Sequence, residues 1–232
     1  MKRHRLGQHY LVDEGVALRM VEYAGINRNE RVLEIGTGRG AVTRLLVRKG
    51  APLLAYEIDS ENFKETVKML DGTEADVRLG DAFAERPTFD VLVASLPYAE
   101  SSTFVRWLCT MKFDRAVVML QRDFVKKLTA PPGSRDYRGV SALAQIAFGI
   151  RVLERVGSEA FSPRPRVGSV VIAIVPRHRL SEREASRIIS LFTLRRRQVD
   201  SALAELGMGG PGHGQRRVFS LGPEEVFELC RG

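Results

Sequence analysis

The sequence predicts an α/β fold, with a doubly wound, mostly parallel sheet of seven strands that is covered by helices on both faces. Short runs rich in Val, Leu and Ile alternate with segments of helical periodicity over the first 121 residues. Such alternation is typical of a parallel sheet. Two further apolar runs follow, and after about residue 176 the periodicity is only helical. These observations predict a large α/β domain of residues 1–176 and a small helical domain of residues 177–232.

The predicted strands are short and apolar. They cover residues 31–35, 53–58, 76–80, 90–95, 115–121, 150–156 and 169–176. The predicted helices among the first five strands cover residues 41–49, 60–70 and 100–111. Candidate N-caps are Asp59 or Ser60 and Ser101 or Ser102. The last two strands should pair antiparallel at an edge of the sheet, because the link FSPRPRVG is too short for a crossover helix.

The C-terminal residues have two helical segments and a break. SEREASRIISLFTLRRRQVDSALAEL, residues 181–206, has helical periodicity throughout, and we expect it to be helical. The Gly-rich stretch GMGGPGHG interrupts the periodicity, and a short helix is predicted in PEEVFELC.

Composition indicates a basic protein of a reducing compartment. The 232 residues include 36 Lys and Arg against 28 Asp and Glu, for a net charge of +8, and 29 of the cations are Arg. Arg suits bidentate phosphate contacts, so a polyanionic partner is plausible, although a basic protein without one remains an alternative. Cys109 and Cys230 lie far apart and without metal-ligand spacing. No apolar run approaches a membrane span of about 20 residues, and the N-terminus lacks a secretory signal, so we expect a cytoplasmic protein.

Three successive strand ends carry residues that suit a nucleoside. Glycines at 36, 38 and 40 follow the first strand and allow close approach to backbone N–H groups. Residue 41 is Ala, which breaks the dinucleotide spacing and makes a dehydrogenase the least favoured class. Glu57 ends the next strand, where a carboxylate can accept both ribose hydroxyls, and Asp81 follows the third. Each feature alone is more commonly a plain turn or a solvated side chain, but their order favours a nucleoside site.

The fourth strand end, SLPY at residues 95–98, resembles the Asn-or-Asp, any residue, Pro, Tyr-or-Phe motif of amino-methylating enzymes that use S-adenosylmethionine. Four other segments resemble the ribosomal RNA adenine dimethyltransferase family, in order along the chain: GQHYL (7–11), MLQRDFVKKL (119–128), FSPRPRVGS (161–169) and LRRRQVDSAL (194–203). The resemblance implies a class I S-adenosylmethionine methyltransferase fold and S-adenosylmethionine as cofactor. The implied reaction is dimethylation of N6 in two adjacent adenines of small-subunit ribosomal RNA. The implied partner is this RNA or the immature small subunit, with no metal and no membrane, and the enzyme is expected to be a monomer.

The resemblance also implies roles for individual residues. His9 and Leu11 would close over the methionine end of the cofactor, with Gln8 in the same motif, and Gly36 and Gly38 would lie beneath that end. Glu57 would bind the ribose, and Ile58 would pack on the adenine ring. Asp81 and the backbone of Ala82 would bind the edge of that ring, and Ser95 would also touch the cofactor. The residues implied to receive the target base are Ser95, Leu96, Pro97 and Tyr98.

The chemistry of an adenine amino group explains the residue types of this last motif. Its nitrogen is a poor nucleophile, because the lone pair is delocalised into the ring, unless acceptors hold its hydrogens. The hydroxyl of Ser95 and a backbone carbonyl from Leu96 and Pro97 can serve as these acceptors. Tyr98 offers a flat face for a base taken out of its stack, a contact worth about 1–3 kcal/mol. No strong general base is required, so positioning should dominate.

Two kinds of feature leave alternatives open. Arg195, Arg196 and Arg197 are consecutive on a predicted helix, where a solvated face competes with RNA phosphate contact, and the family motif favours RNA. Lys126 and Lys127 flank a loop that could line an RNA groove, and Lys2, Arg3 and Arg5 form a basic arm.

Ser95 and His9 both stand where the family usually has Asn. The Ser keeps open a ribosome-assembly factor with weak or lost catalysis. A methyltransferase of another RNA adenine, including a resistance enzyme that modifies large-subunit RNA, is a further alternative.

Overall fold

The computed structural model describes residues 9–209 and 212–231, and the chain groups into two compact units. The first unit comprises Met1–Ser101, Lys112–Arg122 and Ile150–Val175. The second comprises Ser102–Met111, Asp123–Gly149 and Pro176–Gly232. The second unit therefore includes more of the chain than the predicted domain of residues 177–232, and the RNA-binding role of those residues stays a prediction.

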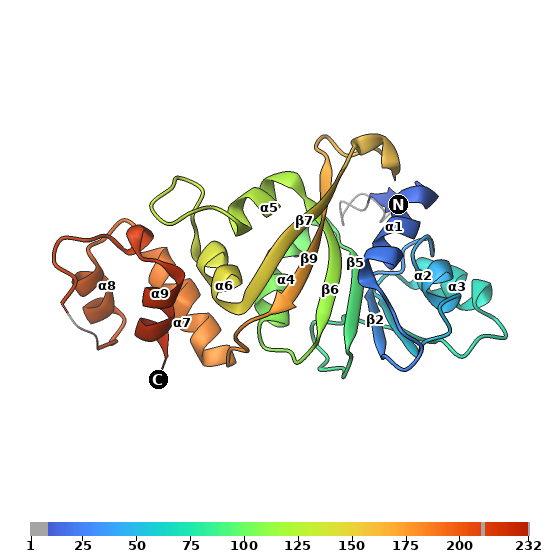
Figure 1. The fold of residues 1–232 in the computed structure, drawn as a ribbon, viewed down its shortest axis with the longest axis horizontal. Coiled ribbons are helices and arrows are strands. Elements are labelled where there is room, and N and C mark those ends of the chain that lie inside the picture. Colours follow the sequence, from blue (N-terminus) through green and yellow to red (C-terminus); the bar gives the residue numbers. More distant parts are fainter. Residues whose placement is uncertain (1–8, 210–211, 232) are drawn as a thin grey trace. The chain divides into compact units, whose positions relative to one another are not determined.

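The central sheet has seven strands in the order β4-β3-β2-β5-β6-β9-β7 (Figure 1). Their bounds are β2 Val32–Ile35, β3 Leu53–Glu57, β4 Asp76–Leu79, β5 Val91–Ser95, β6 Arg115–Gln121, β7 Phe148–Val156 and β9 Ser169–Pro176. The first five strands in this order pair in parallel, and β9 runs antiparallel to β6. β9 and β7 are neighbours at an edge, where the sequence places them. The prediction of a mostly parallel seven-stranded sheet is confirmed.

The three helices predicted among the first five strands are present as α2, α3 and α4, with limits that differ from the predicted ones by up to three residues, whereas α1, α5 and α6 were not predicted. The helix bounds are α1 Glu14–Ala24, α2 Thr43–Val47, α3 Ser60–Met69, α4 Ser101–Leu108, α5 Arg122–Leu128, α6 Gly139–Ala147, α7 Glu182–Thr193, α8 Val199–Glu205 and α9 Pro223–Cys230. Short 3-10 helices are η2 Tyr98–Glu100, η3 Ser158–Ala160 and η4 Val218–Ser220. Asp59 is the N-cap of α3, since its side chain accepts from the backbone N–H groups of Glu61 and Asn62.

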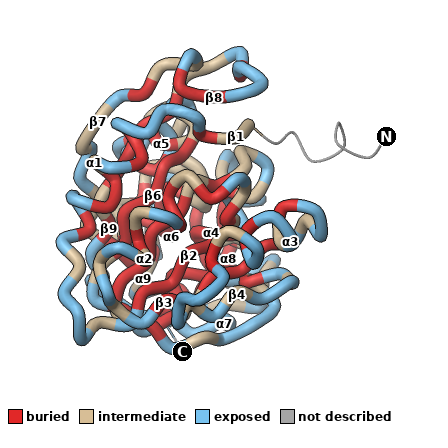
Figure 2. Tube along the Cα trace, turned by 90° about the vertical axis from the view of Figure 1, so that its right-hand side faces the viewer, coloured by how far each residue is buried: buried red, intermediate tan, exposed pale blue. Residues whose placement is uncertain are grey.

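The core of the first unit lies between α1 and the middle of the sheet. Val16, Met20 and Val21 of α1 are buried, and the helix packs on β5 and β6. The strand β2 is buried along its whole length. Figure 2 shows the central strands largely as buried segments. Burial of each large aliphatic side chain contributes about 1.5–3 kcal/mol. The sheet is thereby a rigid frame for the loops at the carboxyl ends of its parallel strands.

A second, two-stranded sheet was not predicted. Inside the Pro-rich link, β8 (Phe161–Ser162) pairs antiparallel with β1 (Tyr10–Leu11). Tyr10 lies opposite Ser162, and Leu11 lies opposite Phe161. Segments about 150 residues apart in the chain are thus held side by side.

The prediction of helix throughout residues 181–206 is wrong at its centre. Arg195, Arg196 and Arg197 lie in a turn between α7 and α8. The backbone N–H of Arg195 bonds three residues back, to Phe192 O at 3.3 Å, and its carbonyl accepts from Phe219 N at 3.0 Å. The chain is therefore turned out of the helix by pairing with a distant segment, and the three arginines are not presented on one helical surface.

Candidate active site

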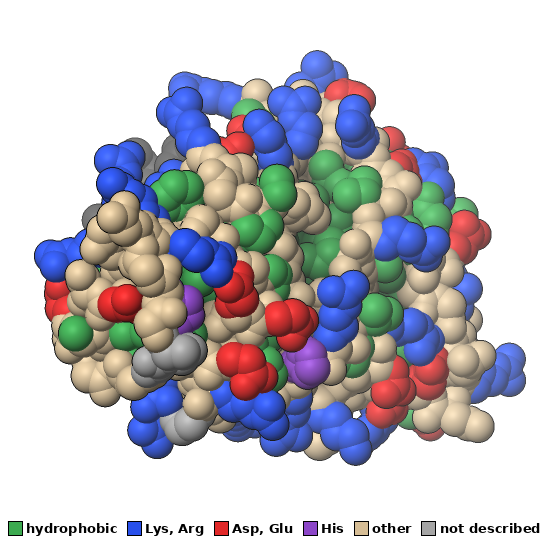
Figure 3. All heavy atoms as spheres, turned by 60° about the vertical axis from the view of Figure 1, so that its left-hand side comes forward, with side chains coloured by type: hydrophobic (Ala, Val, Ile, Leu, Met, Phe, Trp, Pro, Cys, Tyr) green, Lys and Arg blue, Asp and Glu red, His purple; other side chains and the backbone are tan. Residues whose placement is uncertain are grey.

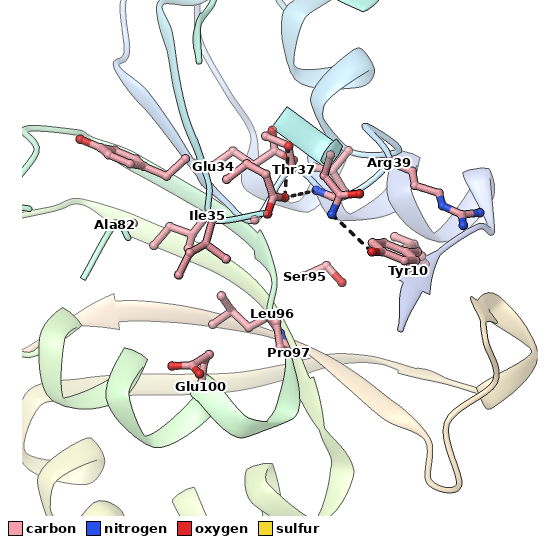
Figure 4. A pocket seen from close by; sticks show the side chains of 18 of the residues that line it. Tyr10, Glu34, Ile35, Thr37, Arg39, Ala82, Ser95, Leu96, Pro97 and Glu100 are labelled. Carbon is pink, nitrogen blue, oxygen red and sulfur yellow. Dashed lines mark hydrogen bonds between the residues drawn. The ribbon is translucent and has the colours of Figure 1, made fainter. Parts of the chain in front are cut away.

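One pocket of the first unit lies at the carboxyl ends of β2, β3, β4 and β5 (Figure 4). It is lined by every predicted cofactor residue: His9, Leu11, Gly36, Gly38, Glu57, Ile58, Asp81, Ala82 and Ser95. Leu96 and Pro97 of the predicted target-base motif line it as well. The structure therefore brings residues from five separate segments of the sequence to one cavity, and their individual roles stay predictions.

The loop after β2 requires glycine. Gly36 and Gly38 have φ values of +78° and +53°, which side chains with a Cβ rarely adopt. A Cβ at Gly38 would also lie 3.2 Å from the Tyr10 ring. The backbone of this loop can consequently approach a ligand closely.

Glu57 joins the loop after β2 to the loop after β3. Glu57 is only 3% exposed, and its carboxylate accepts from Gly38 N at 2.7 Å and from Asp59 N at 2.8 Å. Each carboxylate oxygen can accept more than one hydrogen bond. Glu57 therefore holds both loops and retains acceptor capacity toward the pocket.

Glu34 is a pocket residue that the sequence analysis did not single out. It lies within the apolar strand β2, is 2% exposed, and its Oε2 has no hydrogen-bond partner among the described residues. Burial raises the pKa of Glu34 to about 8; the nearby Thr43 hydroxyl lowers this pKa, and the charge of Glu57 raises it. A single acidic residue inside an apolar strand is the sequence signal that could have found it.

Tyr10 and Asn62 were missed as well. Asn62 Nδ2 donates to Tyr10 Oη at 3.4 Å, and the Arg39 guanidinium lies 4.7 Å from the centre of the Tyr10 ring (Figure 4). These side chains form the wall of the pocket beside the glycine loop.

The motif of residues 95–98 borders two cavities. Ser95, Leu96 and Pro97 line both the large pocket and a smaller adjoining cavity, whereas Tyr98 lines only the smaller one. Tyr98 Oη donates to Val167 O at 3.3 Å and lies 2.8 Å from Ser169 Oγ. The Tyr98 ring is therefore held in place by its hydroxyl, while Ser95 Oγ has no hydrogen-bond partner within the described part of the chain.

Comparison with known proteins identifies the family of this chain. The family model described as ribosomal RNA adenine dimethylase matches residues 1–217. The chain belongs to this family. A probable ribosomal RNA small subunit methyltransferase A of Pyrococcus abyssi is 33% identical over 240 residues, which cover 97% of this chain and 89% of the relative.

Solved structures confirm the predicted fold class. A dimethyladenosine transferase from Plasmodium falciparum has a TM-score of 0.80 at 22% identity, with 95% of this chain and 96% of that chain covered. The 23S rRNA methyltransferase ErmE has a TM-score of 0.68 at 25% identity, with 96% and 100% covered. The prediction of a ribosomal RNA adenine methyltransferase is confirmed at the level of the family, whose members depend on S-adenosylmethionine.

The predicted RNA contacts of this dimethylase family member lie in its second unit. Lys126 and Lys127 are exposed on α5, and Lys126 pairs with Asp136 at 3.3 Å. Arg196 and Arg197 are exposed in the turn, and Arg197 pairs with Glu205 at 2.8 Å. Figure 3 shows Lys and Arg side chains spread over one face of the molecule.

Arg195 differs from its two neighbours. It is half-buried, with its guanidinium 5.7 Å from the centre of the Phe219 ring and Nη2 donating to Arg135 O at 3.4 Å. Burial, followed by the charges of Arg138 and Arg196, lowers the pKa of Arg195. It therefore contributes to packing within the turn. The predicted Gln8, Lys2, Arg3 and Arg5 lie outside the described residues.

None of the helices in the two described ranges is long and apolar enough to cross a membrane. Residues 9–209 and 212–231 also contain no group of three or more His, Cys, Asp or Glu side chains that could hold a metal ion.

Proposed function

We propose that this chain binds S-adenosylmethionine in the pocket at β2–β5 and transfers two methyl groups to N6 of each of two adjacent adenines in small-subunit ribosomal RNA. The observation that carries the proposal is that the nine predicted cofactor residues and three of the target-base residues line one cavity. The name of the Pyrococcus abyssi relative supports the small subunit as substrate.

The residues present fit this cofactor. Glu57 has acceptor capacity for ribose hydroxyls, and Asp81 offers a carboxylate at the next strand end. Ile58 is 60% exposed although it is apolar, and an adenine ring packed on it would remove this surface from water. The carboxyl of Glu34, which lines the pocket, has an oxygen that is unpartnered among the described residues and can hydrogen-bond to a ligand. When bound, S-adenosylmethionine supplies a methyl group on a positively charged sulfur.

The target adenine would enter beside β5. Ser95, which lines the pocket, lies between the Tyr10 ring and Pro97 (Figure 4), and its hydroxyl is available to accept a hydrogen of the amino group. Tyr98, held by Ser169, offers its ring face to the base. These residues position the nucleophile, and positioning accounts for much of the rate.

Incubation with S-adenosylmethionine labelled in its methyl group and with undermethylated small subunits tests the proposal. Nucleoside analysis should show dimethyladenosine at two adjacent positions. Cofactor binding without any transfer would instead support an assembly factor. In a parallel incubation with large subunits, label found there and not in small subunits would support the resistance enzyme.

Ser95 is expected to take part in the reaction. Ser95→Ala should lower the single-turnover rate ~10-fold at saturating cofactor, since one acceptor to the amino group is lost. Ser95→Asn should retain activity, because its amide oxygen is also an acceptor. Equal rates for the wild type and the Ala variant would remove the hydroxyl from the mechanism.

Arg196 is expected to contact RNA phosphate. Arg196→Gln should reduce the slope of log affinity against log salt concentration by about 0.7–1, the change for one lost phosphate contact. Arg183→Gln, which removes an exposed charge from α7 near its start, is the matched control and should leave the slope unchanged. Filter binding to small-subunit RNA across a salt series measures both, and identical slopes for the two variants would argue against the contact.

A further inference from the structure

We propose that His9 is a catalytic residue of the methyl transfer, whose Nε2 accepts the proton that the adenine amino group loses. This inference rests on the proposed function, because it requires the target base beside Ser95. It goes beyond the predicted role of His9, which is to close over the cofactor.

The hydrogen bond of His9 determines which ring nitrogen is available. His9 Nδ1 lies 2.7 Å from the carbonyl oxygen of Pro163. A carbonyl oxygen can only accept, so Nδ1 carries the hydrogen. In the neutral ring Nε2 is then the unprotonated acceptor. The pairing of Tyr10 with Ser162 holds His9 beside Pro163 and so maintains this tautomer.

His9 lies where the two cavities of the site meet. It lines both of them, as do Ser95, Leu96 and Pro97. Its ring centre is 5.9 Å from that of Tyr98. The imidazole is therefore close to both groups that are expected to hold the target base.

The other side chains of the smaller cavity are poor proton acceptors. They are Ser95, Leu96, Pro97, Tyr98, Met119, Phe161 and Ser169. Tyr98 Oη is occupied by Val167 O and Ser169 Oγ. Among the residues that the structure describes around this cavity, the His9 ring offers an unprotonated nitrogen, Nε2, as the proton acceptor.

The methyl transfer leaves one proton in excess, which gives His9 its proposed role as acceptor. The amino nitrogen forms a bond to the methyl carbon while the sulfur–carbon bond breaks, and the electron pair of that bond stays on sulfur. The nitrogen then holds one proton in excess. Transfer of this proton to Nε2 gives an imidazolium whose Nδ1 still donates to Pro163 O, and release to solvent restores the neutral ring. Two methylations of one adenine require two such cycles.

Other ionisable groups share the pocket and affect its pH dependence. The carboxyl groups are Glu34 of β2, Glu57 of β3, Asp81 after β4 and Glu100 of η2. The guanidinium is that of Arg39, after β2, and the phenols are Tyr10 of β1, Tyr56 of β3 and Tyr98 of η2. All of them are unchanged in a His9 variant, so the difference between two pH profiles isolates the imidazole.

The test compares single-turnover methylation by the wild type and by His9→Asn between pH 5 and 9, at saturating cofactor. The wild-type rate should fall toward acid with a one-proton dependence, because a proton already on Nε2 prevents its transfer from the amino group. His9→Asn should be about 10-fold slower at pH 8, at the low end of general-base effects, and should lack this dependence. Parallel pH profiles would overturn the proposal.

Two further measurements separate catalysis from cofactor binding and from folding. The dissociation constant for S-adenosylmethionine should change less than about threefold in His9→Asn, and a rise equal to the loss in rate would overturn the proposal. Nitrogen NMR of the wild-type ring above pH 8 should show hydrogen on Nδ1, and hydrogen on Nε2 would also overturn it. An inactive wild type would refute the proposed function itself, whereas an active wild type with parallel profiles refutes only the role of His9.

Discussion

Replacement of Glu57 by Ala is expected to weaken S-adenosylmethionine binding by about 100-fold. The carboxylate accepts from Gly38 N and Asp59 N, and Glu57 is 3% exposed, so the variant leaves both N–H groups without their acceptor. That loss lowers the stability of the loops, whereas the affinity falls because the ribose loses its proposed charged acceptor. Hydrogen bonds to a charged group contribute about 1.5–3 kcal/mol, and a loss of about 2.8 kcal/mol corresponds to 100-fold in affinity. Calorimetric titration with the cofactor measures the effect.

Two variants show whether the loss belongs to this carboxylate. Glu61→Ala removes an exposed carboxylate in the first turn of α3 and should leave the dissociation constant unchanged. Glu57→Gln keeps one carbonyl oxygen and should fall between the wild type and Glu57→Ala. Wild-type affinity in a folded Glu57→Ala protein would exclude Glu57 from the ribose site.

The order of the elements could be predicted because the parallel sheet leaves a strong local signal. A strand such as Val91–Ser95 is buried on both faces, so its residues form an unbroken apolar run. The start of α3 is also determined by neighbouring residues, since the Asp59 side chain accepts from the N–H groups two and three positions after it. Predicted and observed limits of these elements consequently differ by only a residue or two.

The turn at residues 194–198 could not be predicted, because a distant segment ends the helix. Val199 N donates to Arg216 O at 2.9 Å, and Phe219 N donates to Arg195 O at 3.0 Å. Helical periodicity continues through the turn in the sequence, and no Gly or Pro marks the break. The two-residue strands β1 and β8 are a similar case, since neither is long enough to show a pattern.

Site residues that follow predicted strands could be found from the sequence. Properties of the site that depend on tertiary contacts could not. Glu57 and Asp81 follow strands whose carboxyl ends must meet at one edge of the sheet. The tautomer of His9 depends on Pro163, and the protonation of Glu34 depends on how deeply β2 is buried. Neither the tautomer of His9 nor the protonation state of Glu34 can be inferred from the residues next to it in the sequence.

Replacement of Glu34 by Gln is expected to stabilise the cofactor-free protein at neutral pH and to leave it unchanged in acid. The folded protein holds the pKa of Glu34 at about 8, against an ordinary value of 4.5. As the pH rises above 4.5, the unfolded chain releases this proton and the folded chain keeps it, so unfolding becomes more favourable until about pH 8. At pH 7 the wild type should therefore be less stable than Glu34→Gln by up to about 3 kcal/mol. Below pH 4 both states of the wild type are protonated, and the difference should vanish.

Urea unfolding of both proteins from pH 4 to 8.5 measures this difference. Arg115 lowers the pKa of Glu30, and Arg31 lowers that of Asp90, so these pairs make both proteins lose stability as the pH falls. Because they are common to the two proteins, they cancel from the difference. Glu22→Gln, at an exposed position of α1, is the matched control and should show no such pH dependence. A difference between wild type and Glu34→Gln that stays constant from pH 4 to 8.5 would mean that Glu34 titrates as an ordinary carboxyl, and a buried neutral acid in the pocket would then be excluded.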